Sequence, residues 1–276
     1  MIPAGPSGAV GSSGVVEPAW AAGSSGFVES SGVAQSAWAA GSSGVAQSSW
    51  EIEQLRGSVP ALLEAPEPAL QVVRLARIHT VTDPGLVLGS IQKSETADAG
   101  LAAAAGVEVA RRRSGGGSVL LLPEKQVWAD FFITPSDPLW HDDVALAAGW
   151  VGRLWRDALS RHLPERESRR LSLHTGRAEA DRWGRLVCFA GRGPGEVLAG
   201  DLKVVGVSQR RSRHRARFQT TARVGGGLCE LDETDLLDLP PADREAGRAV
   251  LAERCGAVAA TAQAVAESLL QALAEF

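Results

Sequence analysis

The chain has 276 residues, of which 45% are hydrophobic and 22% are charged, a composition typical of a soluble globular protein of one or two domains. Its three cysteines, Cys188, Cys229 and Cys255, lie far apart, which excludes a disulfide framework and a cysteine-rich zinc site. The net charge of −4 comes from four glutamates within residues 1–55, and the neutral remainder argues against nucleic-acid binding. With no membrane-spanning apolar run and no signal-peptide pattern, we expect a cytoplasmic protein that does not contact membranes.

Residues 1–49 are a Gly/Ser/Ala-rich repeat. SSGVVEP begins at Ser12, and related heptapeptides begin at Ser24, Ser30 and Ser42, at spacings that are multiples of six residues. Units of this composition bury too little apolar surface to offset the entropy lost when they become ordered. We therefore expect a disordered tail over residues 1–49 and a folded domain over residues 50–276.

Between residues 51 and 133 the pattern predicts short helices and short strands. The expected helices cover residues 51–64, ended by prolines, and 97–105, ended by Gly106. The expected strands combine alternating or continuous apolar residues with flanking glycine or proline, and cover residues 70–78, 85–89, 107–111, 118–122 and 126–133. We expect the last two strands to form a β-hairpin.

Beyond residue 133 the strongest signal is a helix over residues 142–162, whose apolar residues recur every three or four positions. Residues 186–224 then alternate strands with glycine turns, and residues 241–276 form two helical stretches broken near Gly256. Strands flanked by helices without a regular βα repeat predict an α+β fold around a mixed sheet.

A glycine-rich segment, RRRSGGGS, occupies residues 111–118 after a predicted strand. It matches neither the P-loop nor the dinucleotide-binding pattern. The backbone N–H groups of Gly115, Gly116 and Gly117 can line an anion or let a thin ligand pass close to the chain, and neighbouring arginines would add phosphate contacts. A flexible turn with a solvated basic flank explains the same residues equally well.

Lys203 is one of only three lysines, and it lies between a Gly-Asp turn and a Val-Val strand that ends at Gly206. From such a strand a lysine can reach into a sheet-lined pocket and hold a phosphate or a carboxylate, although an exposed strand lysine is equally compatible with the pattern. The arginine-rich run at residues 210–217 lacks the interleaved aromatic residues of a nucleic-acid site. It indicates a solvated loop or a contact for an acidic partner.

Taken together, RRRSGGGSV and the later GEV…GDLKVVGVSQ resemble the lipoate–protein ligases and octanoyltransferases of the biotin/lipoate ligase superfamily. GLVLGSIQK at residues 85–93 is similar to the family's strand before the glycine-rich segment. The resemblance covers residues 50–260, so the repeat tail lies outside it.

The resemblance implies an α+β catalytic domain at residues 50–276 that attaches a lipoyl or octanoyl group to a lysine of a lipoyl carrier domain, such as 2-oxoacid dehydrogenase E2 or a glycine-cleavage H-type protein. In the ligases, ATP with Mg²⁺ activates lipoate or octanoate as an acyl-adenylate, and no protein-bound metal is implied. Lys203 would contact the acyl carboxylate and the α-phosphate and stabilise the charge that develops there. The residues expected along the acyl-adenylate are Arg112, Ser114, Gly115, Gly116, Gly117, Ser118, Val119 and Leu120.

Three positions depart from the ligase pattern. Ser118-Val-Leu-Leu-Leu122 replaces Ala-Val-aromatic-His-Asp, Gly195-Glu196 replaces Asn-Asp, and Phe218-Gln219 replaces His-His. ATP use is therefore open.

Cys188 supplies an alternative, because it falls where some octanoyltransferases of the superfamily place their nucleophile. Such enzymes accept the acyl group as a thioester and need no ATP, and nearby Arg192 or Lys203 would stabilise the thiolate. The other explanation of Cys188 is a small buried hydrophobic residue on a strand, as free cysteines often are, and we expect Cys229 and Cys255 to be structural. A third possibility is a member that binds acyl groups or the carrier domain without turnover.

Overall fold

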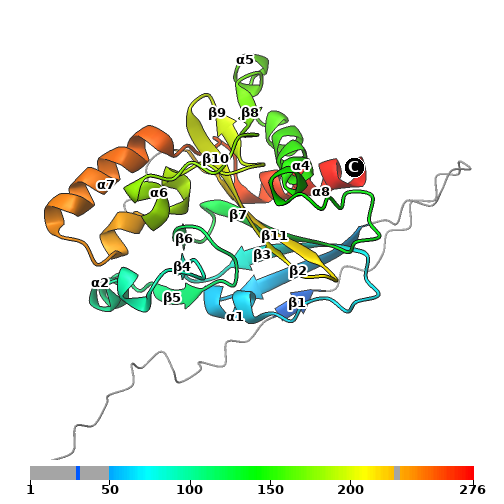
Figure 1. Ribbon diagram of the computed structural model, residues 1–276. Helices are drawn as coiled ribbons and strands as arrows, with labels where there is room; N and C mark the ends of the chain where they lie inside the picture. The colour runs from blue at the N-terminus through cyan, green and yellow to red at the C-terminus, as the bar shows by residue number, and fades with distance from the viewer. Residues whose placement is uncertain (1–28, 32–49, 227–230) are drawn as a thin grey trace, which may run out of the picture.

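An eight-stranded sheet forms the centre of the fold in this computed structural model, which describes residues 29–31, 50–226 and 231–276 (Figure 1). Its strands, in order across the sheet, are β1 (Glu29–Ser31), β2 (Glu51–Gly57), β3 (Arg74–Val81), β7 (Gln126–Ile133), β11 (Ala216–Arg223), β10 (Leu202–Arg211), β9 (Val197–Ala199) and β8 (Leu171–Leu173). Only the β2–β3 pair is parallel, and the other neighbours are antiparallel. The mixed sheet confirms the predicted α+β class.

Helices cover one face of this sheet. Figure 1 shows α4 (Gly149–Ser160) beside α8 (Ala262–Ala274) on that face, and α4 buries Val151, Leu154 and Ala158 as the periodicity predicted. A third long helix, α7 (Pro241–Arg254), precedes α8 in the chain. Shorter elements are α3 (Val144–Ala147), α5 (Glu165–Ser168), α6 (Arg182–Leu186) and the 3₁₀ turns η2 (Ser94–Thr96), η3 (Cys188–Ala190) and η4 (Glu233–Leu236). None of the helices in these ranges has the length and apolar character needed to cross a bilayer.

A second sheet of three strands lies against the opposite face of the large sheet, together with α1 (Val59–Glu64). In order, its strands are β5 (Glu108–Arg111), β4 (Gly85–Leu88) and β6 (Val119–Leu121), and α2 (Ala99–Ala104) precedes β5. The predicted hairpin between residues 118–122 and 126–133 is therefore wrong, because β6 pairs with β4. β7 is buried on both faces and takes β3 and β11 as its neighbours, so the two segments enter different sheets.

The helix predicted over residues 51–64 is also wrong in its first half. Residues 51–57 form β2 along β3, and the helix begins only after Ser58, where a proline occupies its first turn. The helix predicted over residues 142–162 is divided at Ala148 into α3 and α4. The two C-terminal helices, and the helix ended by Gly106 in the left-handed conformation (φ +66°), agree with the prediction.

The strand β1 lies within the repeat segment and pairs with β2 through its backbone. The rest of residues 1–49, and with it the predicted disorder, lies outside the described residues, as does Cys229. Cys255 ends α7, and burial raises the pKa of its thiol to about 12, in keeping with a structural role.

A charged cluster is buried on the face of the large sheet that carries α1. Asp130 of β7 accepts hydrogen bonds from Arg217 Nη2 at 2.5 Å and from Trp128 Nε1 at 3.1 Å, and its other neighbour is His79 Nε2 at 3.1 Å. The Asp130 and His79 side chains are fully buried. Burial works against the charge of Asp130, but Arg217 and His79 outweigh it and hold the pKa of this carboxyl well below its usual range.

We expect the free energy of unfolding to fall as the pH drops below about 6.5, the ordinary histidine pKa. Burial lowers the pKa of His79 despite the attraction of Asp130, so below that pH the unfolded chain binds a proton that the folded chain does not. Urea unfolding above and below this pH measures the effect, which His79→Gln should reduce. The exposed His214 supplies the control. The expectation fails if His214→Gln and His79→Gln change the pH dependence equally.

Candidate active site

The glycine-rich segment packs directly against the turn that carries Cys188. Ser118 donates its backbone N–H to Leu186 O at 2.8 Å, and the N–H of Cys188 donates to Ser118 O at 2.9 Å. A Cβ atom at Gly117 would lie 2.7 Å from the backbone nitrogen of Cys188, so only glycine allows this approach. Two segments some seventy residues apart in the sequence thus form one backbone platform.

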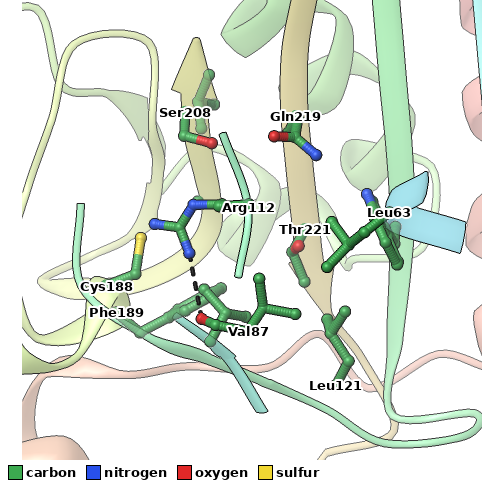
Figure 2. Close-up of a pocket in the computed structure, with 13 residues that line it drawn as sticks. Leu63, Val87, Arg112, Leu121, Cys188, Phe189, Ser208, Gln219 and Thr221 are labelled. Atoms are coloured by element: carbon green, nitrogen blue, oxygen red, sulfur yellow. Dashed lines mark hydrogen bonds between the residues drawn. The ribbon is translucent and has the colours of Figure 1, made fainter. Parts of the chain in front are cut away.

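Arg112 holds this platform from within. Its side chain is buried, and Nη2 donates to the carbonyl oxygens of Gly115 at 2.7 Å and Gly117 at 2.8 Å. Nη1 donates to Val87 O, as Figure 2 shows, and Nε has no hydrogen-bond partner among the described residues. Burial lowers the pKa of Arg112, and the Cys188 sulfur partly offsets that effect. A guanidinium bonded only to neutral carbonyl groups keeps an uncompensated positive charge, so Arg112 can attract a neighbouring anion.

Lys203 is buried, which excludes the exposed strand lysine of the alternative interpretation. Its Nζ lies 2.7 Å from Glu196 Oε1 and donates to the carbonyl oxygens of Cys188 at 2.7 Å and Gly191 at 3.1 Å. The Cys188 Sγ is 3.7 Å from the same nitrogen. Burial favours the neutral amine, but Cys188 and Glu196 outweigh it and raise the pKa of Lys203 above its ordinary value. Lys203 is therefore an ammonium beside a thiol.

Glu196 is a site residue that the sequence analysis did not predict. It accepts hydrogen bonds from the backbone N–H groups of Gly193 at 2.7 Å and Val207 at 3.3 Å, which fix its carboxylate against Lys203. It occupies one of the positions where the chain departs from the ligase pattern, so resemblance gave it no role. An acid seven residues before a lysine at a glycine turn was the only available signal.

A cavity of about 420 Å³, including its open mouth, lies between the two sheets beside these groups. Cys188 and Arg112 line one side, and in Figure 2 the cysteine sulfur points towards the guanidinium group. Leu63 of α1 lies across the cavity from Cys188 (Figure 2). Apolar side chains form most of the remaining wall: Val87, Val119, Leu121, Trp128 and Phe189. An elongated ligand with an apolar tail and a reactive polar end fits such a cavity.

The predicted site residues divide between lining the cavity and supporting it. Arg112 and Val119 line it, whereas Ser118 donates its hydroxyl to Leu186 O and Leu120 faces a second, more polar cavity on the other side of β6. Ser114 donates its hydroxyl to Gln219 Oε1 at 2.9 Å. Gln219 and Ser208, which form a cross-strand pair of β11 and β10, line the cavity and were not predicted. Arg192 bonds to the Asp201 carbonyl group instead of Cys188.

The described residues offer no dedicated metal site. No three His, Cys, Asp or Glu side chains within the described ranges are placed to share an ion. Mg²⁺ that arrives with a nucleotide needs only one or two carboxylates. The buried carboxylate at this site, Glu196, is already bonded to Lys203.

Comparison by sequence finds no relative: no protein-family model matches the chain, and neither does any curated protein. Comparison by structure finds proteins with a similar fold. Protein Ta0514 of T. acidophilum, proposed as a lipoate protein ligase and solved with bound lipoic acid, superimposes with a TM-score of 0.56 at 15% identity, covering 83% of this chain and 86% of that one. Lipoate-protein ligase A bound with ATP gives a TM-score of 0.55 at 16% identity, covering 83% and 85%.

The fold is that of the lipoate–protein ligases. The two motifs predicted this resemblance, and the superposition confirms it for the fold. Within the lipoate–protein ligase fold, this chain combines a buried Lys203–Glu196 pair with Cys188 at the cavity wall.

Proposed function

We propose that this chain is an acyltransferase that moves an octanoyl or lipoyl group from a thioester donor to the lysine of a lipoyl carrier domain, with Cys188 as the nucleophile. The observation that carries the proposal is the position of Cys188. Its sulfur lies at the wall of an apolar cavity, faces Arg112 and is 3.7 Å from the Lys203 ammonium. Thiolate is the reactive form of cysteine, and two cationic side chains flank this sulfur.

In the first step the Cys188 thiolate attacks the carbonyl carbon of the donor thioester. A new sulfur–carbon bond forms, the carbonyl electrons move to oxygen, and the tetrahedral adduct collapses as the donor thiolate leaves. In the second step the neutral amine of the carrier lysine attacks the acyl-Cys188 carbonyl carbon. The amide forms, and the amine proton passes to the departing cysteine sulfur.

The role proposed for Lys203 follows from its position beside the sulfur. Negative charge develops on the carbonyl oxygen in both steps, and the fixed positive charge of the nearby ammonium stabilises it. Glu196 holds the ammonium in place through the 2.7 Å ion pair. Gly117 and Ser118 bring the glycine-rich platform to the same side of the cavity.

ATP-dependent ligation of lipoate or octanoate is the second candidate, favoured by the likeness in fold to lipoate-protein ligase A bound with ATP. In that reaction Lys203 and the backbone of the glycine-rich segment would lie along the acyl-adenylate. A nucleotide would have to compete with Glu196 for Lys203, because the ammonium is already paired.

The two routes differ in whether the enzyme itself becomes acylated. We expect the full chain, mixed with an octanoylated carrier protein, to gain the mass of one octanoyl group that hydroxylamine removes. Addition of a lipoyl carrier domain should then move that mass to the carrier without ATP. Cys188→Ser should abolish both events, and Cys255→Ser, which alters a half-buried thiol that does not line the cavity, should leave them unchanged.

The opposite results would assign the other functions. Acylation of the carrier only with ATP and free lipoate or octanoate, unaffected by Cys188→Ser, would establish the ligase. Failure of both donors with retained binding of the fatty acid would establish a protein that binds acyl groups without turnover.

A further inference from the structure

The cavity lies over one face of the large sheet and extends across its strands, along a row of paired residues. Trp128 of β7 is the register partner of Thr221 of β11, which in turn pairs with Gly206 of β10, and these three residues line the cavity. At the Gly206 end the ring of Phe189 lies 3.4 Å from where a Cβ atom would be, beside Cys188. Because the Phe189 ring and the Lys203 side chain cover Gly206, an acyl chain bound to Cys188 would pass this ring and run over Thr221 towards Trp128.

Trp128 ends this row. It packs in one buried cluster with Val87 and Leu121, and Leu63, which lies across the cavity from Cys188, packs against that cluster (Figure 2). Neighbouring strands are spaced about 4.8 Å apart, so the row from Gly206 to Trp128 spans about 10 Å, close to the length of an extended chain of about eight carbons. A longer straight chain would meet the indole ring.

The indole ring of Trp128 is held on its edge and on one face. Its Nε1 donates to Asp130 Oδ1 at 3.1 Å, and the His79 ring stacks on it with centroids 4.2 Å apart and planes inclined at 29°. Arg217 donates to the other oxygen of the same carboxylate. Buried ionic groups seldom add stability over apolar residues of the same size, whereas they fix geometry when fully bonded. The cluster prevents the ring from swinging aside to admit a longer chain.

We propose that Trp128 sets the maximum length of the acyl chain at about that of octanoyl or lipoyl, and that Asp130, with His79 and Arg217, positions its ring. This inference deepens the proposed function, since it names the substrate class of the same cavity. Its test nevertheless uses binding alone.

The test measures the affinity of the full chain for free hexanoate, octanoate, decanoate, dodecanoate and palmitate by calorimetry. The wild type should bind octanoate most tightly and lose affinity for the longer acids. Trp128→Leu should shift the preference to decanoate or dodecanoate by about tenfold or more, because each buried methylene contributes about 0.8 kcal/mol. Trp128→Phe, which keeps a ring but not the indole N–H, should give an intermediate limit and serves if Trp128→Leu does not fold.

Trp155→Leu is the matched control, because Trp155 is equally buried but lies in α4 on the opposite face of the sheet. It should lower stability without changing the length preference. For the positioning role, Asp130→Asn keeps an oxygen for the indole N–H but removes the charge that Arg217 holds. It should widen the range of chains bound at unchanged octanoate affinity, an effect that a loss of folded protein does not produce.

The proposal is overturned if Trp128→Leu and wild type rank the acids alike, or if Trp155→Leu changes the ranking equally. Retained length selection without any acyl transfer would refute the proposed function and leave this inference standing. Transfer of the octanoyl group without length selection would do the reverse.

Discussion

Lys203→Met should reduce the rate of acyl transfer by about 10²–10³-fold, the usual effect of removing one fixed donor from a developing oxyanion. Methionine matches the length of the aliphatic part of lysine and carries no charge, and the Nζ that the substitution removes lies 3.7 Å from the Cys188 sulfur. The single substitution also leaves the buried Glu196 carboxylate without its cation, which costs stability.

The double variant Lys203→Met/Glu196→Gln separates these two effects. It removes both charges together, so we expect stability close to that of the wild type while transfer stays slow. Single-turnover transfer of octanoyl from Cys188 measures the rate, and circular dichroism measures the fold. Lys93→Met, an exposed lysine outside the cavity, should leave both unchanged. A double variant as fast as the wild type would remove Lys203 from the mechanism.

Asp130→Ala should lower the free energy of unfolding by about 3–5 kcal/mol, because it leaves a buried guanidinium without its counter-charge. Asp130 is fully buried and bonds to Arg217, Trp128 and His79. Urea denaturation gives the value.

Asp157→Ala supplies the comparison, since Asp157 pairs with Arg156 at the surface, where both side chains are more than 40% exposed. An exposed pair contributes about 0–1 kcal/mol. Similar losses for the two variants would show that the cluster beneath Trp128 does not behave as a buried ion network.

Local chemistry predicted most of the fold, and long-range pairing explains the errors. Gly106 ends α2 as predicted, because the left-handed backbone conformation that ends a helix favours glycine and depends on that residue alone. Residues 118–122 and 126–133 each have the composition of a strand, and a hairpin is the shortest way to connect them. In the fold the first segment pairs with β4, whereas β7 pairs with β3 and β11, where both of its faces are buried. The partners of β7 lie far away in the sequence, so no turn residue near β7 indicates which strands it pairs with.

The site residues likewise divide into those that sequence motifs predicted and those that only tertiary contacts bring to the site. Lys203 and the glycine-rich segment came from two motifs that had to occur together, and the fold confirms the family resemblance that they predicted. Their roles as site residues stay a prediction. Glu196 and Gln219 were not predicted as site residues, because each acts through a contact across strands or turns. Glu196 contacts Lys203, and Gln219 contacts Ser114. Neither residue carries a local pattern that distinguishes it from an ordinary polar residue.

The ion pair between Lys203 and Glu196 has a consequence for self-acylation. An enzyme that delivers acyl groups to an amine exposes its own lysines to the same reagent, and an amine reacts only through its free electron pair. In the proposed reaction, against the effect of burial, the neighbouring Glu196 carboxylate, 2.7 Å away, raises the pKa of Lys203, so this amine stays protonated beside the acyl-Cys188 carbonyl group and does not attack it. With Lys93 and Lys125 as the only other lysines in the chain, few amines compete with the incoming carrier.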